Sequence, residues 1–260
     1  MASDTMVVTD AIVEEVLGVT ITTVVDNQSA QPGLNHVWGL SLHVNIQFPG
    51  RTEALLMDTS GSAQVFRHNT QALNLDFTNL RALVITHFHH DHFGAIQPAL
   101  ELIHHTDLVA YLPASHDALE LTLSQSNIRC VIAEEASIIR SGVSTTGALG
   151  PKKLKEHGVV INVERVGIVL LIGCAHPKVG RLLQSAKKIF PGRPVHAVIG
   201  GFHLKTEEEG VRVGELFVHE EVNLVSPCHC THKSAKEAIR RVVGDDVYRE
   251  NGSGTIFSIM

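Results

Sequence analysis

The stretch THFHHDHFG, residues 86–94, holds four histidines and one aspartate within six consecutive positions. It follows RALVIT, residues 81–86, whose near-continuous apolar character predicts a strand buried on both faces. The histidine-rich stretch then lies in the loop at the carboxyl end of that strand, where ligands usually bind in α/β sheets. In extended backbone, His87 and His89 place their imidazole rings on the same side of the chain, so one metal ion could take both.

Asp91 and His92 come as the chain turns into the next predicted helix. There a carboxylate oxygen and a further imidazole nitrogen can face a second metal ion close to the first. A solvent-exposed polar loop is the alternative interpretation of the stretch. The buried strand directly before it favours the metal site.

Three further histidines each follow a predicted apolar strand. His176 follows GIVLLIGCA, His203 follows AVIGGF and His229 follows NLVSPC. If these strands enter their sheet in the same direction, their ends converge on the first cluster. We expect His176 and His229 to be metal ligands, and His203 to contact the substrate or to support the ligands.

The remaining sequence alternates short apolar runs with amphipathic stretches and contains no long linker. Residues 41–48 alternate apolar and polar side chains, which predicts a strand with one buried face. Each half of the chain begins with predicted strands and continues with alternating strands and helices. This order predicts two sheets packed face to face with helices outside. We expect a single domain over residues 1–260. Helices are predicted at residues 95–105, 115–123 (capped by Ser115), 177–190 (beginning at Pro177), 206–217 and 234–243.

Composition excludes a disordered tail and a mini-protein. The chain has 260 residues, of which 44% are apolar and 18% charged, enough to bury about 75% of its unfolded surface. Lysine and arginine total 21 against 27 acids, a net charge of −6, so we expect no nucleic-acid partner. Histidine is unusually frequent, with 17 copies, which points to metal or proton chemistry.

The predicted location is the cytoplasm. Residues 1–16 carry acids where a secretory signal needs a basic start and an apolar run, and no segment reaches the roughly 20 apolar residues of a membrane span. The 4 cysteines are too few for a disulfide scaffold, which fits a reducing compartment. We therefore expect neither secretion nor a membrane partner.

Several blocks of the chain resemble one known family. THFHHDHFG resembles the H-x-H-x-D-H signature of the metallo-β-lactamase superfamily, and Asp58 resembles its early structural aspartate. Blocks at residues 39–44, 171–177, 198–204 and 227–231 resemble a narrower subgroup of that superfamily. The subgroup includes an archaeal dihydropterin ribofuranosylaminobenzene 5′-phosphate synthase and many metal-dependent hydrolases. The resemblance covers most of the chain and implies an α+β four-layer αββα sandwich with a dinuclear metal site at one sheet edge.

The resemblance also implies two sets of metal ligands. The first set is His87, His89 and His176, and the second is Asp91, His92 and His229. Many superfamily members bridge the metals with a carboxylate at the place where this chain has Cys174. Either Cys174 lies near the metals or a water or hydroxide alone bridges them, and we favour water because a buried cysteine is usually a small apolar residue. Strand alternation predicts that Cys228 and Cys230 point away from whatever His229 faces and serve in packing.

Five nitrogens and one carboxylate suit two divalent ions, Zn²⁺ first, although Fe, Mn or Co would also fit. The superfamily's di-iron redox branch has glutamate where this chain has His89, which favours hydrolysis over redox chemistry. Two metal ions lower the pKa of a bridging water from 15.7 to about 7, which supplies a metal-bound hydroxide for an ester, phosphoester or lactam-type bond. Asp91 would orient that nucleophile, and His203 would protonate the leaving atom or clamp the substrate.

Two other functions remain open from the sequence. One is a condensing transferase like the dihydropterin synthase, and the other is a metal-binding protein without turnover. The predicted partner is a small molecule, for which an anion is one candidate. The sequence indicates no particular oligomeric state. Trp38 and the nearby His36 either form a pocket wall or anchor the first sheet.

Overall fold

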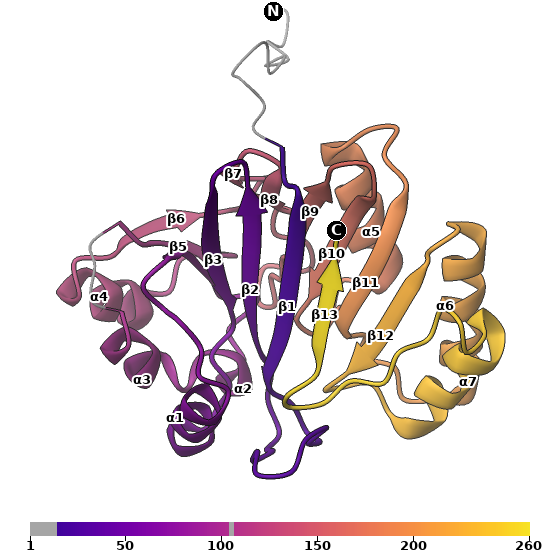
Figure 1. Cartoon of the computed structure of the whole chain (residues 1–260), viewed down its shortest axis with the longest axis horizontal. Helices are drawn as coiled ribbons and strands as arrows, with labels where there is room; N and C mark the ends of the chain where they lie inside the picture. The colour runs from indigo at the N-terminus through magenta and orange to yellow at the C-terminus, as the bar shows by residue number, and fades with distance from the viewer. Residues whose placement is uncertain (1–14, 104–106) are drawn as a thin grey trace, which may run out of the picture.

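A computed structural model describes residues 15–103 and 107–260, which form two β-sheets between outer helices (Figure 1). The first sheet has the order β13-β1-β2-β3-β4-β5-β6 and the second has the order β12-β11-β10-β9-β8-β7. Residues 1–14, on which the expectation about a secretory signal depends, lie outside the described residues.

The strands of the first sheet are β1 (Gly18–Val25), β2 (Ser41–Phe48), β3 (Arg51–Met57), β4 (Leu80–Val84), β5 (Val109–Leu112), β6 (Arg129–Ile132) and β13 (Ile256–Ile259). Those of the second are β7 (Ile138–Arg140), β8 (Val143–Thr145), β9 (Val159–Val163), β10 (Gly167–Ile172), β11 (Val195–Gly201) and β12 (Leu224–Cys228). The helices are α1 (Ala63–Ala72), α2 (His90–Phe93), α3 (Ile96–Glu101), α4 (Asp117–Gln125), α5 (Val179–Ile189), α6 (Glu207–His219) and α7 (Lys233–Val243).

Three apolar clusters hold the layers together. The central cluster packs the inner faces of the two sheets, with Val44 from β2 and Val169 from β10 both fully buried. A second cluster lies under α1, α3 and α4, and a third lies under α5, α6 and α7. The layer order is therefore helix, sheet, sheet, helix, which confirms the predicted αββα sandwich.

Strand direction places the loops that matter for function at one edge. Strands β3 to β6 run parallel to one another, as do β10, β11 and β12. In β4, Val84 faces the central cluster and Leu83 faces the cluster under the helices, so this strand is buried on both faces as predicted. The carboxyl ends of the parallel strands carry Asp58, His87, Cys174, His203 and His229 just beyond them.

Three details of the helix predictions are wrong. The helix expected over residues 95–105 is shorter, because Gly94 ends α2 and Ala95 has a non-helical backbone before α3; residues 104–106 lie outside the described residues. Helix α4 is capped by His116, whose Nδ1 accepts from the N–H of Leu119, and not by Ser115. Pro177 precedes α5, because Lys178 has a φ of 83° that no helix permits.

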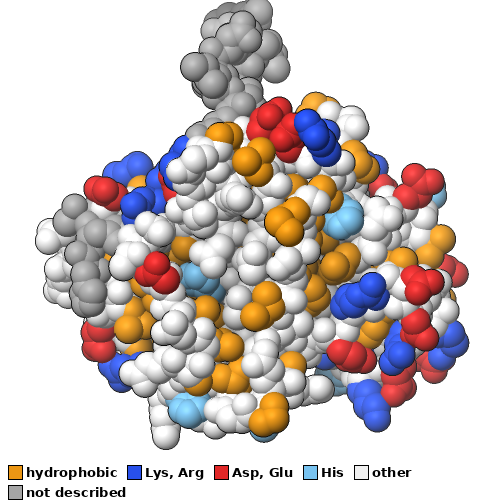
Figure 2. Space-filling view, in the orientation of Figure 1, with side chains coloured by type: hydrophobic (Ala, Val, Ile, Leu, Met, Phe, Trp, Pro, Cys, Tyr) orange, Lys and Arg blue, Asp and Glu red, His pale blue; other side chains and the backbone are white. Residues whose placement is uncertain are grey.

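The surface carries charges of both signs. Figure 2 shows basic and acidic side chains intermixed over the region of α6 and α7, where Arg241 pairs with Glu207 and Arg240 with Asp245. Among residues 15–103 and 107–260, the helices are all too short or too polar to cross a bilayer.

Candidate metal centre

The first predicted ligand set comes together at the ends of β4 and β10. His87 Nε2 lies 3.1 Å from His89 Nδ1. The ring of His176 is 4.7 Å from that of His87 and 4.8 Å from that of His89, measured between centroids. One nitrogen from each of the three rings lies within 4.8 Å of the others, which is compatible with binding one ion.

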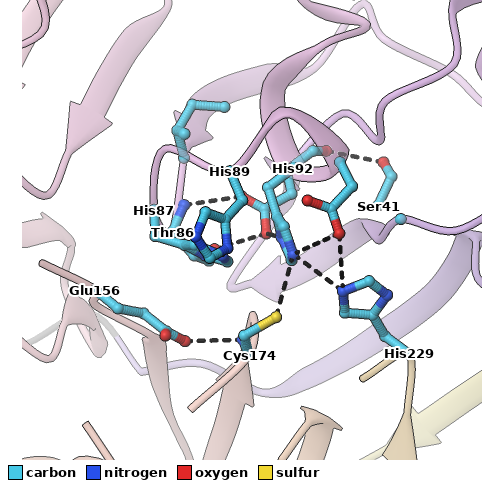
Figure 3. Close-up of polar contacts among 12 residues, drawn as sticks. Ser41, Thr86, His87, His89, His92, Glu156, Cys174 and His229 are labelled. Carbon is cyan, nitrogen blue, oxygen red and sulfur yellow. Dashed lines mark hydrogen bonds and ion pairs between the residues drawn. The ribbon is translucent and has the colours of Figure 1, made fainter. Parts of the chain in front are cut away.

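The second predicted set comes together beside the first. His229 Nε2 lies 3.2 Å from His92 Nε2 and 3.3 Å from Asp91 Oδ2. Figure 3 shows the imidazoles of His87, His89 and His92 grouped together, with His229 approaching from a different segment of the chain. Side chains that are 137 residues apart in sequence thus meet at one point.

Hydrogen bonds fix which nitrogen of each ring faces the centre. The Nδ1–H of His92 donates to Asp58 Oδ2 at 2.6 Å, and that of His176 donates to Glu156 Oε2 at 2.7 Å. The Nδ1–H of His229 donates to Asn27 Oδ1 at 3.1 Å. In the neutral tautomer with its N–H on Nδ1, each ring presents the lone pair of the Nε2 atom turned inward. This second layer of oxygen acceptors is typical of histidines that bind metals.

The arrangement of these donors fits a cation. His92 Nε2 and His229 Nε2 lie 3.2 Å apart, and Asp91 Oδ2 lies 3.3 Å from His229 Nε2, so three atoms that can bind a cation converge there. Burial, followed by the neighbouring imidazoles, holds the pKa of His87 well below its usual value, so its ring is neutral and able to bind. Burial alone would raise the pKa of Asp91, but hydrogen bonding to His229 and nearby imidazoles lower it, so its carboxylate is charged.

Glu156 belongs to the candidate site, and sequence reasoning missed it. Its fully buried carboxylate accepts from the N–H groups of Cys174, Ala175 and His176 at 2.7–2.8 Å, besides His176 Nδ1. Burial would raise the pKa of Glu156, but these donors lower it and keep the group ionised. The available signal was an acid three residues before the apolar strand β9.

Asp26 is a second residue of the candidate site that sequence reasoning missed. It directly follows β1, is fully buried, and accepts from the backbone N–H of His229 at 2.8 Å. It therefore holds the turn from which the His229 ring enters the centre. An acid immediately after an apolar strand is the signal that would have identified it.

The cysteines differ in part from the predictions. Cys174 Sγ lies 3.3 Å from His92 Nε2 (Figure 3), which favours the alternative that Cys174 lies near the metals. Cys230 was expected to point away from the surroundings of His229, yet its Sγ lies within 4.8 Å of Cys174 Sγ and a His229 nitrogen. Strand alternation fails here because β12 ends at Cys228 and His229 has a φ of 49°. Cys228 itself packs in the central cluster, as expected.

His203 lies at the border of the cluster. Its ring centroid is 4.7 Å from that of His176, and its Nδ1 is buried without a hydrogen-bond partner among the described residues. The adjacent Cys230 raises the pKa of His203, although burial acts in the opposite direction. A partly exposed imidazole with a raised pKa beside a metal centre can donate a proton near neutral pH.

Comparison with known proteins identifies the fold. No protein-family model matches the chain. The 7,8-dihydropterin-6-methyl-4-(β-D-ribofuranosyl)-aminobenzene-5′-phosphate synthase of Methanocaldococcus jannaschii is 23% identical over 254 aligned positions, which cover 81% of this chain and 86% of that protein.

Three solved structures align with most of the chain. Tm1679, a metal-dependent hydrolase of the β-lactamase superfamily, has a TM-score of 0.70 at 21% identity and covers 92% of this chain and 98% of its own. YhfI from Bacillus subtilis, a metallo-β-lactamase fold protein, has a TM-score of 0.61 at 12% identity and covers 93% and 99%. The short form of human tRNase Z has a TM-score of 0.58 at 13% identity and covers 93% and 99%. The chain therefore has the metallo-β-lactamase fold, and the resemblance found in its sequence is confirmed.

Proposed function

We propose that the chain is a metal-dependent hydrolase that binds two divalent metal ions and cleaves an ester, phosphoester or lactam-type bond of a small molecule. The observation that supports this most strongly is the convergence of six donor side chains at the junction of the two sheets. The first ion would be held by His87, His89 and His176, and the second by Asp91, His92 and His229. The similarity in fold to a metal-dependent hydrolase supports the reaction class.

Zinc is the first candidate among the metals, because imidazole, carboxylate and thiol donors all suit it. Cys174, with its Sγ 3.3 Å from His92 Nε2, would add a sulfur donor between the two sets. Bound ions of this kind activate water and polarise the oxygen of the bond that is cleaved.

The chain's own residues would supply the remaining steps. The ionised carboxylate of Asp91, 20% exposed, can accept a hydrogen bond from the attacking water and orient it. His203 lies against His176 and carries a proton more readily than an ordinary histidine. We propose that Asp91 orients the nucleophile and His203 protonates the leaving atom.

Metal analysis combined with a substrate panel tests this proposal. We expect two equivalents of metal in the purified protein and hydrolysis of at least one substrate among phosphodiesters, lactones and β-lactams. His87→Ala should abolish hydrolysis and lower the metal content, whereas His219→Ala, at an exposed histidine of α6, should change neither. Full metal occupancy with no turnover of any substrate would contradict the proposal and leave a binding role.

A condensing transferase is the second candidate, favoured by the 23% identity with the methanogen synthase. In this alternative the same donor set would bind metal, but the leaving group would be pyrophosphate and the acceptor would not be water. Activity with a pterin pyrophosphate and none with the hydrolysis panel would support it.

A further inference from the structure

Trp38 is an unusual surface residue. It is 57% exposed. Of the large apolar residues that are exposed within residues 15–103 and 107–260, it alone is aromatic. An indole that anchored the first sheet would be buried, so that alternative from the sequence is wrong. A single exposed apolar side chain is ordinary by itself, so the place of Trp38 beside the predicted ligands decides what it can do.

The position of Trp38 relates it to the metal centre. Its ring centroid lies 5.0 Å from that of His229, with the ring planes at 52°. The same His229 ring has its Nε2 atom 3.3 Å from Asp91 Oδ2 and 3.2 Å from His92 Nε2. The centre is open to solvent nearby, since His89 is exposed and the Asp91 side chain is 20% exposed. The indole is therefore within reach of a molecule bound at the centre.

The backbone on both sides of Trp38 is held firmly. The N–H of Val37 donates to Asp26 O and that of Gly39 donates to Asn27 Oδ1, each at 3.1 Å. The N–H of Leu40 donates to Asp91 O at 3.2 Å. These bonds tie the loop to the same segments that orient the predicted ligands.

Gly39 allows this close approach. It has a φ of +149°, and a Cβ added there would lie 2.8 Å from Asp91 O. The loop can lie against the Asp91 turn because this position has no side chain. A rigid aromatic surface loses little conformational entropy when it binds a partner.

We infer that Trp38 is a stacking platform for a planar aromatic or heteroaromatic ring of the substrate, held beside the bond that reacts at the centre. This inference rests on the proposed function, because it takes the histidine cluster to be the reacting site. It makes Trp38 a specificity-determining residue and narrows the substrate class to compounds that carry such a ring.

Two probes of the same carbon number test the inference at a pH above the second pKa of both, where they carry the same charge. Phenylphosphonate and cyclohexylphosphonate both offer an anionic group to the metals, and neither can be hydrolysed at its P–C bond. Isothermal titration calorimetry on the zinc-loaded protein should give tighter binding of phenylphosphonate by about three- to tenfold, the range expected for one aromatic pair. Trp38→Ala should abolish this preference, and Trp38→Phe should retain most of it.

The controls separate stacking from support of the metal site. Leu121→Ala, at a leucine of α4 that is 59% exposed, should leave the preference unchanged. Equal affinity of the wild type for the two probes, or no binding of phenylphosphonate, would contradict the inference, as would loss of zinc from Trp38→Ala. Failure of the wild type to retain zinc would instead contradict the proposed function.

Discussion

Asp58 is fully buried and positions two predicted ligands in the segment that follows β4. One carboxylate oxygen accepts from the backbone N–H of Thr86, and the other accepts from the Thr86 hydroxyl and from His92 Nδ1. The Thr86 hydroxyl lies 3.0 Å from His87 Nδ1, so the orientation of two predicted ligands depends on this one side chain. The backbone of Asp58 has a φ of 58°, a strained conformation that is common at functional sites.

Asp58→Asn should weaken metal binding by about 10- to 100-fold, the usual cost of removing an oxygen acceptor behind a metal-binding histidine. Asparagine presents an NH₂ group where the carboxylate accepts hydrogen bonds, so the His92 ring would lose its fixed orientation. Competition against a chromophoric chelator measures the change. The exposed Asp117→Asn on α4 is the control, and equal affinity in the two variants would argue against the role given to Asp58.

His157 shows how burial couples stability to pH. Its Nε2–H donates to Ile85 O at 2.9 Å, and its Nδ1 has no partner among the described residues. Burial lowers the pKa of His157 from 6.5 to about 4. Between these values the unfolded chain binds a proton that the folded chain refuses, so the free energy of unfolding falls as pH falls.

The loss attributable to His157 should be about 2 kcal/mol between about pH 7 and about pH 5. His157→Gln, which keeps an N–H donor but does not titrate, should reduce the pH dependence of the unfolding free energy by that amount. Urea denaturation of both proteins in the presence of a chelator measures it. Parallel pH profiles for wild type and variant would contradict the lowered pKa of His157 in the folded state.

The bounds of several single strands and helices agree with signals in their local sequence. Strand β2 has the predicted bounds, Ser41–Phe48, but its polar face is also buried at Ser41 and His43 and becomes exposed only at Gln47. Helix α6 begins beyond Thr206, whose hydroxyl accepts from the N–H of Glu209 while the Glu209 carboxylate accepts from the N–H of Thr206. Such signals lie within four residues of one another, so sequence alone can identify them.

Contacts between distant elements could not be predicted in this way. The carboxylate of Asp26 meets the N–H of His229 across 203 residues, and Glu156 reaches the turn at Cys174 across 18. The inward position of Cys230 depends on the φ of His229, which only the folded backbone fixes. The predicted ligands could be identified from the sequence because they are histidines and an aspartate grouped beyond apolar strands, whereas Asp26 and Glu156 are single acids whose partners lie elsewhere in the chain.

Thr206→Ala should lower the free energy of unfolding by about 1 kcal/mol, because it removes one half of the capping box. The helix does not contribute a predicted ligand, so metal content should remain unchanged. Chemical denaturation together with elemental analysis tests both statements, and Thr206→Ser should restore stability. A large loss of metal in Thr206→Ala would mean that α6 supports the centre more directly than its position indicates.

At the scale of the whole molecule, the centre joins the two sheets. His87, His89, Asp91 and His92 follow β4 of the first sheet, whereas His176 and His229 follow β10 and β12 of the second. Ions bound between them would link the two halves of the sandwich in the folded state only. Metal binding should therefore stabilise the whole fold.

Removing metal with dipicolinate should lower the midpoint of thermal unfolding. At free metal about 1,000-fold above its Kd, the expected stabilisation by one site is about 4 kcal/mol. Calorimetric scans before and after chelation, and after zinc is added back, measure the effect. The variant His87→Ala should show a smaller decrease, and an unchanged midpoint in the wild type would contradict a structural link through the metals.

The most direct test of the central claim is a crystal structure of the zinc-loaded protein with anomalous diffraction data collected on both sides of the zinc absorption edge. The account predicts two anomalous peaks, one among His87, His89 and His176 and the other among Asp91, His92 and His229. The absence of a peak at this junction, or a zinc ion bound only elsewhere on the chain, would contradict it.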